Sequence, residues 1–295
     1  MTSLEAAVES VAGQDPPAEI VIVIDHNEPL RMGAELRFPG FSVVANSYAR
    51  GLSGARNTGI EAAKGEVVAF LDDDATARPD WLMRLGGAFA DPHVVGAGGA
   101  VWPRWLEGRP EWFPPEFDWV VGCSYRGQPT SPQPVRNLIG CNMSFIRNAI
   151  VSAGGFRSGI GRVGSKPLGG KETELCIRLR LLSPESIILY DPRIAVDHDV
   201  PRARSRFSYF VSRCVAEGIS KAQIARLVGT RYGLSSERRH VAFALPRALV
   251  DAARAAVGRG DAWGFVRALV VIVGLVAAMA GYATGMTRGA WRSAG

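Results

Sequence analysis

Cysteine is scarce in this sequence. The 295 residues include four cysteines, Cys123, Cys141, Cys176 and Cys214, and none lies in a C-x-x-C pair or at a metal-ligand spacing. The distribution argues against a cysteine-based metal site and predicts buried thiols in a reducing compartment, although it does not exclude a disulfide. No secretory signal peptide is expected either, because residues 1–18 are polar and contain Glu5, Glu9 and Asp15.

Acidic residues are scarce in the C-terminal third. Residues 201–295 carry 15 Lys and Arg against 4 Asp and Glu, a net charge of +11, which leaves about −5 for residues 1–200 of a chain whose total is +6. Such a basic region suits nucleic acid or an anionic membrane. The region has no recognised nucleic-acid-binding motif, and its basic residues flank an apolar run, so we expect no nucleic-acid partner.

Long apolar runs are absent except for one near the C-terminus. Residues 268–287 contain no charged side chain. At ~1.5 Å per residue, such a helix can cross a ~30 Å hydrocarbon core. Its glycines make it only moderately hydrophobic, so a buried helical hairpin is the alternative. We expect a basic helical segment over 201–240 and membrane-associating helices over 241–295, held at the cytoplasmic face of the cell membrane by the basic residues that precede the run.

The first 100 residues alternate between strand-like and helix-like patterns. Apolar residues in Ser3–Ala12 recur at helical spacing, and a second helix is expected from Ser53 to Lys64. Short β-branched runs at Ile20–Ile24, Phe41–Ala45 and Val67–Leu71 predict buried strands. This alternation predicts an α/β fold with a parallel sheet and crossover helices.

Three adjacent carboxylates follow the Val67–Leu71 strand directly, at Asp72, Asp73 and Asp74. In open α/β sheets, ligands bind beyond the carboxyl ends of strands. Adjacent acids repel one another, so such a cluster is stable in solvent or around a cation, and hard oxygen ligands suit Mg²⁺ or Mn²⁺. Taken alone, the trio fits a solvated acidic turn equally well.

An ordered set of motifs resembles the family 2 nucleotide-sugar glycosyltransferases. The set begins with Gly54-Ala55-Arg56-Asn57-Thr58-Gly59-Ile60 and Phe70-Leu71-Asp72-Asp73-Asp74. It continues with Gly140-Cys141-Asn142-Met143-Ser144-Phe145, Gly154-Gly155-Phe156 and Glu172-Thr173-Glu174-Leu175-Cys176-Ile177-Arg178-Leu179, so that the resemblance covers about residues 4–225.

The resemblance implies a GT-A (Rossmann-like) catalytic domain over residues 1–200, with a mostly parallel sheet flanked by helices. It also implies an inverting, metal-dependent transfer of a sugar from a UDP-, GDP- or dTDP-sugar donor. The cofactor would be Mn²⁺ or Mg²⁺, and the acceptor would be a hydroxyl of a lipid-linked or cell-envelope glycan.

Donor and metal roles follow from the same resemblance. Asp74, with Asp72 as a bridge and His198 completing the site, would bind the metal, although a lone histidine after a strand is equally often structural. Donor contacts would come from Asp73 to the ribose, from Asp25 to the nucleobase and from Arg56 to the nucleotide. The alternatives are a strand-end cap for Asp25 and a structural salt bridge to the acid cluster for Arg56.

The general base is expected at the start of the helix that follows a glycine-rich loop. The resemblance assigns it to Glu172, with Glu174 as the fallback, although both could be ordinary first-turn acids. Lys171 stands where relatives carry an acid, and it should depress the pKa of Glu172. Trp112 and Asn142 are the candidate acceptor-binding residues, and packing is the commoner use of tryptophan.

One family feature is missing: a first strand inside the sheet, before the first helix. Its loss would leave neighbouring strands without partners, at ~1–3 kcal/mol for each unpaired buried group. We therefore expect a true start upstream of Met1 or a degenerate gene. The alternative to an active enzyme is a catalytically impaired relative that binds nucleotide sugars or membranes.

Overall fold

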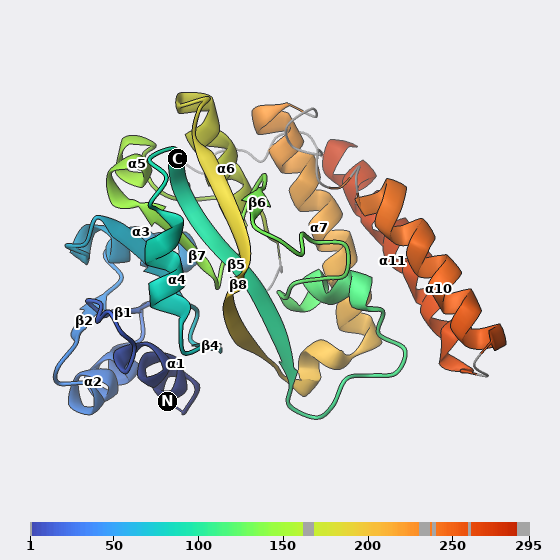
Figure 1. Cartoon of the computed structure of the whole chain (residues 1–295), viewed down its shortest axis with the longest axis horizontal. Helices are drawn as coiled ribbons and strands as arrows, with labels where there is room; N and C mark the ends of the chain where they lie inside the picture. Colours follow the sequence, from blue (N-terminus) through green and yellow to red (C-terminus); the bar gives the residue numbers. More distant parts are fainter. Residues whose placement is uncertain (1, 162–167, 230–236, 238–239, 259–260, 288–295) are drawn as a thin grey trace. The chain divides into compact units, whose positions relative to one another are not determined.

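The structure is a computed structural model that describes residues 2–161, 168–229, 237, 240–258 and 261–287 (Figure 1). The chain forms two compact units. The first unit comprises residues 1–104, 129–159 and 171–199, and the second comprises residues 105–128, 160–170 and 200–295. The second unit thus includes two segments that the sequence-based boundaries place in the catalytic domain.

The first unit begins with a small layer in which helices cover a two-stranded parallel sheet. Helix α1 (Thr2–Ala12), strand β1 (Val21–Ile24) and strand β2 (Ser42–Ala45) form where the apolar patterns predict them. Helix α2 (Glu28–Arg37) was not predicted, although Asn27 caps it by accepting a hydrogen bond from the backbone N–H of Leu30. Val8, Ile22 and Phe38 pack together in the core of this layer.

The second sheet has six strands in the order β3-β7-β5-β8-β4, with β6 paired to β8. Its strands are β3 (Val67–Phe70), β4 (Ala75–Ala77), β5 (Val94–Trp105), β6 (Gln133–Pro134), β7 (Met143–Ile146) and β8 (Ile187–Val200). The unit is mixed α/β, as predicted, and its other helices are α3 (Leu52–Ala62), α4 (Trp81–Ala88), α5 (Arg147–Ser152) and α6 (Lys171–Leu182).

The prediction of a mostly parallel sheet is wrong for this larger sheet. The pairings of β3 with β7, β5 with β7, β4 with β8 and β6 with β8 are all antiparallel. Strands β3 and β5 are parallel to one another, as strands joined by a crossover should be, but β7 lies between them and runs the other way. The alternation of strands and helices says nothing about a strand that returns from a long connection and inserts itself between two others.

The core of the first unit lies between this sheet and helices α3, α5 and α6. Phe145 of β7, Ile150 of α5 and Leu175 of α6 are fully buried there. The chain from Ile187 to Val200 forms one continuous strand, β8. Asp191 accepts hydrogen bonds from the backbone and guanidinium of Arg193, so the Asp191-Pro192-Arg193 step does not end the strand.

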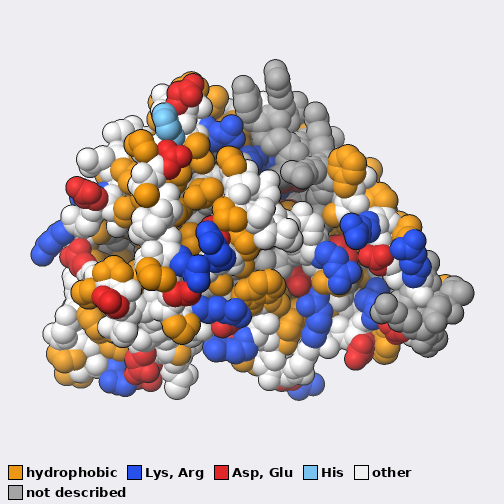
Figure 2. All heavy atoms as spheres, viewed as in Figure 1, with side chains coloured by type: hydrophobic (Ala, Val, Ile, Leu, Met, Phe, Trp, Pro, Cys, Tyr) orange, Lys and Arg blue, Asp and Glu red, His pale blue; other side chains and the backbone are white. Residues whose placement is uncertain are grey.

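Three helices dominate the second unit and run side by side in Figure 1: α7 (Phe207–Val228), α10 (Leu245–Gly258) and α11 (Trp263–Thr287). Helix α11 is long and apolar enough to cross a membrane, by length and composition alone. On the face shown in Figure 2, basic side chains gather over the helices of this unit. The unit also contains η1 (Pro115–Val121), η2 (Arg202–Ser205) and η3 (His240–Ala244).

All four cysteines are buried and free, as the sequence predicts. Three tryptophans, Trp105, Trp112 and Trp119, pack against phenylalanine rings inside the second unit. Trp105 lies 5.1 Å from Phe113 between ring centroids, and Trp119 lies 5.6 Å from Phe117. The expected packing use of these rings is therefore confirmed.

Candidate active site

The acid trio lies where β3 ends and the chain turns into β4. Antiparallel pairing of β4 with β8 places Ala75 opposite His198. This register brings His198 Nε2 to 3.3 Å from Asp74 Oδ1, and the backbone carbonyl of Asp74 accepts a hydrogen bond from the N–H of Asp199. Two of the three predicted metal ligands are therefore neighbours.

Arg56 of α3 connects this trio with the predicted base. Its Nη1 donates to Glu172 Oε1 at 2.6 Å, and its Nη2 lies 3.5 Å from Asp72 Oδ1. Nη2 also donates to the carbonyl oxygen of Gly140 at 3.0 Å. One buried guanidinium thus holds together parts of the chain that are 116 positions apart in sequence. The salt-bridge alternative for Arg56 is what the structure contains.

Aromatic rings hold the guanidinium from its other side. The Cζ atom of Arg56 lies 5.9 Å from the ring centroid of Phe70 and 5.3 Å from that of Phe156. Asn57 fixes Phe156 by accepting its backbone N–H at 2.8 Å and donating to its carbonyl oxygen at 2.9 Å. Gly155, with φ of +68°, precedes this clamp in a conformation that glycine adopts readily. The motifs Gly54–Ile60 and Gly154-Gly155-Phe156 therefore pack together around the Arg56 guanidinium.

Gly140 is a site residue for which the sequence motif alone predicts no role. A Cβ atom at this position would lie 2.5 Å from Glu172 Oε1 and 2.8 Å from Arg56 Nη2. Any side chain at residue 140 would therefore push the ion pair apart. Gly140 stands in the Gly140–Phe145 motif, but the sequence does not show why a glycine is needed there, because the reason is the distant Arg56–Glu172 pair that lies opposite it.

Burial and Arg56 set the charge states of the two acids in opposite directions. Burial alone would raise the pKa of Glu172, but the charge and hydrogen bond of Arg56 hold that pKa below its usual value. Lys171 lowers it as well, as predicted, but contributes less than Arg56. Burial raises the pKa of Asp72, and the nearby carboxylates of Asp74 and Glu172 add to the rise, while Arg56 opposes it.

The fallback base lies in a different environment. Glu174 is fully buried and pairs with Arg178 at 2.7 Å and with Arg157 at 3.2 Å. Arg178 also donates to the carbonyl oxygen of Gly155 at 2.8 Å. Glu174 therefore holds α6 against the Gly154-Gly155-Phe156 turn and does not share the environment of Glu172.

The two other predicted donor contacts, Asp25 and Asp73, differ in exposure. Asp25, at the end of β1, accepts hydrogen bonds from the amide of Asn46 at 2.6 Å and from the N–H of Gly51 at 2.9 Å. It therefore makes the cap predicted as an alternative while remaining partly exposed. Asp73 is the exposed member of the trio.

The two candidate acceptor residues lie in different units of the chain. Asn142 is fully buried and accepts from Trp81 Nε1 at 2.8 Å, while its amide donates to the carbonyl oxygens of Ala100 and Ile194, both at 2.9 Å. These bonds join β5, β8 and α4, so the side chain is used inside the protein, contrary to the prediction. Trp112 belongs to the second unit, where its ring packs against Phe113, Phe207 and Phe210.

The acid trio and His198 are the ligand types that a divalent cation prefers, but they do not form a complete coordination sphere. Among the residues that the structure describes, no group of three or more His, Cys, Asp or Glu side chains converges on one metal position. Asp74 and His198 face one another, and Asp72 leans toward Arg56. Mg²⁺ is often held by one or two carboxylates plus substrate phosphates, so a partial protein site of this kind suits a cation that arrives with a diphosphate.

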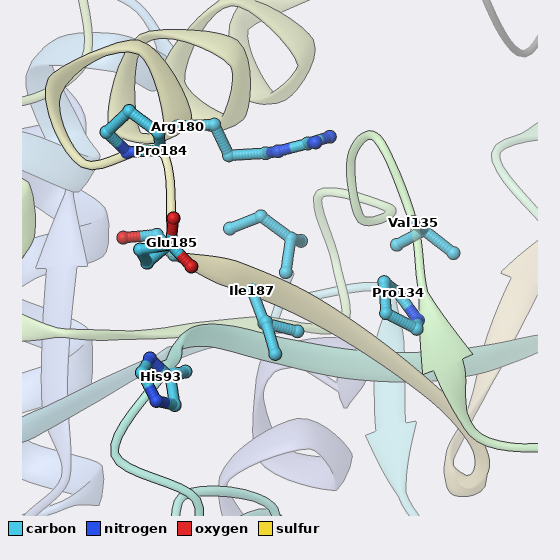
Figure 3. A pocket seen from close by; sticks show the side chains of 9 residues that line it. His93, Pro134, Val135, Arg180, Pro184, Glu185 and Ile187 are labelled. Atoms are coloured by element: carbon cyan, nitrogen blue, oxygen red, sulfur yellow. The ribbon is translucent and has the colours of Figure 1, made fainter.

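A cavity of about 340 Å³ in the first unit lies away from these residues (Figure 3). Val135 and Ile187 contribute apolar walls, and exposed Arg180, Glu185 and His93 lie at its edges. Arg180 is in the last turn of α6 and Glu172 in its first, so the two ends are separated by about 12 Å of helix. The cavity is therefore distinct from the acid site.

Comparison with known proteins agrees with the geometry. Residues 2–152 match Glycosyl transferase family 2. A glucosyl-dolichyl phosphate glucuronosyltransferase of Haloferax volcanii is 38% identical over 224 residues, which are 74% of this chain and 71% of that protein. A pre-mycofactocin glycosyltransferase of Mycobacterium tuberculosis is 30% identical over 188 residues, 62% of this chain but only 37% of that protein.

Solved structures share the fold at low sequence identity. A mannosyltransferase of Pyrobaculum calidifontis, in complex with GDP-Man and Mn²⁺, superposes with a TM-score of 0.57 at 16% identity over 93% of this chain and 82% of that one. GalNAc-T7 with UDP, GalNAc and Mn²⁺ superposes with a TM-score of 0.53 at 15% identity over 81% of this chain and 55% of that one. From the motifs around Arg56, the GT-A fold and these matches, we conclude that the chain belongs to glycosyl transferase family 2.

Proposed function

We propose that this chain is an inverting glycosyltransferase that moves a sugar from a nucleotide-diphosphate donor to a hydroxyl of a lipid-linked or cell-envelope glycan. The observation that carries the proposal is the position of Arg56, which contacts Glu172 and Asp72 at once. A candidate base and a candidate cation site therefore belong to one constellation, as a single displacement at a sugar carbon requires.

Glu172 is the proposed general base. It accepts the proton of the acceptor hydroxyl while that oxygen forms a bond to the anomeric carbon, and the bond from this carbon to the diphosphate oxygen breaks. The nucleoside diphosphate leaves with the bonding electrons, and attack from the opposite side inverts the anomeric configuration. The lowered pKa keeps Glu172 ionised at neutral pH and therefore able to accept a proton, while making it a weaker base.

The donor end is assigned to the acid trio and its neighbours. Asp74 and His198, with Asp72, would hold Mn²⁺ or Mg²⁺. A cation bound there supplies neutralisation of the charge that develops on the departing diphosphate. The exposed carboxylate of Asp73 is available to a ribose hydroxyl, and Asp25, at the end of β1, is available to the nucleobase of the donor. Arg56 orients Glu172 and balances its charge.

A membrane location supports a lipid-linked acceptor. The Haloferax relative is named for a dolichyl phosphate acceptor. One side of α11 exposes an apolar stripe at helical spacing, made of Phe265, Leu269, Ile272, Val276 and Met279. Together with the net charge of +11 in residues 201–295, this stripe favours the cytoplasmic face of an anionic membrane.

A second candidate is a catalytically impaired relative that still binds nucleotide sugars. Two observations favour it: the carboxylate of Glu172 is already paired with Arg56, and the described residues hold no converged group of three metal ligands. An acceptor hydroxyl would then find no free base in the resting site.

Donor turnover separates the two candidates. Donor hydrolysis and transfer are measured with UDP-, GDP- and dTDP-sugars in Mn²⁺, using the full chain, Asp74→Ala, Glu172→Gln and the control Asp91→Ala, an exposed acid in the turn before β5. We expect a donor-dependent thermal shift that Asp74→Ala weakens and Glu172→Gln keeps, and turnover that both site variants lose and the control keeps. Equal turnover in the wild type and Asp74→Ala would favour the impaired relative.

A further inference from the structure

Helix α7 packs tightly against α11 along one of its sides. A Cβ atom at Gly218 would lie 2.0 Å from the carbonyl oxygen of Ala278, and one at Gly281 would lie 2.1 Å from that of Val215. At Gly285 the same atom would lie 2.7 Å from Ala222. Residues 215, 218 and 222 share one face of α7, and the backbones of the two helices are nearly in contact along it. This contact fixes α7 to the apolar helix.

Another side of α7 holds the short segment 168–170. The N–H of Gly169 donates to Ser220 Oγ at 2.9 Å, and Ser220 Oγ donates to the carbonyl oxygen of Ala216 at 2.9 Å. Ser220 is 1% exposed, so no water replaces it as the partner of Gly169. Leu168, which begins the segment, is also buried.

Gly170 closes the contact in a conformation that demands glycine. Its φ is +98°, and a Cβ atom there would lie 2.5 Å from the Cδ1 atom of Ile224. Ile224 is fully buried, one turn of α7 beyond Ser220. The segment is therefore held by one hydrogen bond and one close apolar contact, both from α7.

The segment is bonded directly to the helix that carries the proposed base. Gly170 precedes Lys171, the first residue of α6, and Glu172 follows. We propose that Ser220 and Ile224 are positioning residues for Glu172: by fixing 168–170, they fix where the chain enters α6 and hence the reach of the Glu172 carboxylate toward the acceptor hydroxyl. This inference rests on the proposed role of Glu172 as the base.

A residue that only stabilised the second unit would affect folding and all activities alike. A positioning residue would act on the step that uses the base and leave donor binding unchanged, because the donor contacts come from other elements of the chain. The kcat of transfer and the KM for the donor therefore distinguish the two roles.

The first experiment compares Ser220→Ala with Ser212→Ala in the full chain. Ser212 is an exposed serine on the same helix and serves as the matched control. We expect the transfer kcat of Ser220→Ala to fall about tenfold, as for loss of one buried hydrogen bond, with the donor KM within about twofold of wild type. A kcat equal to that of Ser212→Ala, with an active wild type, overturns the inference. No transfer by the wild type with any donor overturns the proposed function instead.

A second set of variants decides the matter if Ser220→Ala does not fold. Ile224→Val deletes the Cδ1 atom that a residue-170 side chain would meet. We expect Gly170→Ala, which strains the backbone at φ +98° and meets Ile224, to lose at least about tenfold in kcat with the donor KM within about twofold of wild type, and Ile224→Val to show a smaller loss in kcat. A folded Gly170→Ala variant that keeps the wild-type kcat overturns the inference.

Discussion

Removing the positive charge of Arg56 should destabilise the protein in a pH-dependent way. In Arg56→Met, the carboxylates of Glu172 and Asp72 lose the cation that lies between them. Breaking a buried ion pair by deleting one partner costs about 3–5 kcal/mol. Because the Asp72 side chain is 32% exposed, we expect the lower end, about 3 kcal/mol at pH 7. A domain with ~5–15 kcal/mol of stability would still fold.

The sign of the pH dependence follows from the position of Glu172. In the wild type its pKa is below the usual value, so Glu172 stabilises the fold at neutral pH, and this contribution is lost as the pH falls through that pKa. In Arg56→Met, burial raises the pKa instead, and stability is lost as the pH rises. The stability gap between the two proteins should therefore be wide at pH 7 and narrow at pH 4.

Arg56→Lys separates charge from geometry. A lysine keeps the positive charge, but one ammonium cannot reach Glu172, Asp72 and the Gly140 carbonyl together. We expect a loss of about 1–2 kcal/mol with little pH dependence. The stabilities of the wild type, Arg56→Met and Arg56→Lys are measured from urea unfolding curves at pH 4 and pH 7. The reasoning would be refuted if the unfolding free energies of the wild type and Arg56→Met differed by less than about 1 kcal/mol at pH 7, or by the same amount at both pH values.

Three further predictions concern other parts of the chain. Gly140→Ala should lower transfer activity at least about tenfold through displacement of the Arg56–Glu172 pair, with a melting temperature within a few degrees of wild type; wild-type kcat would contradict this. Burial raises the pKa of Asp118 to about 6 despite its ion pair with Arg109, so wild-type stability should fall by up to about 3 kcal/mol as the pH rises from about 4 to 6, while Asp118→Asn should show no such fall in calorimetry. The double variant Ile272→Asp, Val276→Asp should lose most co-flotation with vesicles containing anionic lipid, and unchanged flotation would exclude the α11 stripe as the membrane contact.

Elements with a local apolar pattern were predictable, and long-range pairings were not. Helix α1 and strands β1, β2 and β3 formed where side-chain periodicity placed them. The insertion of β7 between β3 and β5 left no trace in that pattern, because a strand's direction depends on connections elsewhere. Helix α2 is different: its cap at Asn27 and the proline in its first turn were readable signals.

The site divides in the same way. The resemblance of the motifs to family 2 pointed to Asp72, Asp74, His198 and Glu172, and the β4–β8 register places Asp74 beside His198. Nothing in the sequence near Arg56 showed that its guanidinium would meet Glu172, because the partner is contributed by a distant helix. Asn142 illustrates the opposite error, since a motif asparagine that suggested ligand contact is fully occupied in joining strands.

The pairing of β4 with β8 has a consequence for biosynthesis. The acid trio leaves the ribosome early, but the imidazole that faces Asp74 is made 124 residues later, in β8. During that interval β4 has no partner on that side, and three like charges stay close together without the histidine. Nascent chains stalled before β8 should therefore be protease-sensitive around residues 72–77, and the assembled site is a late product of folding.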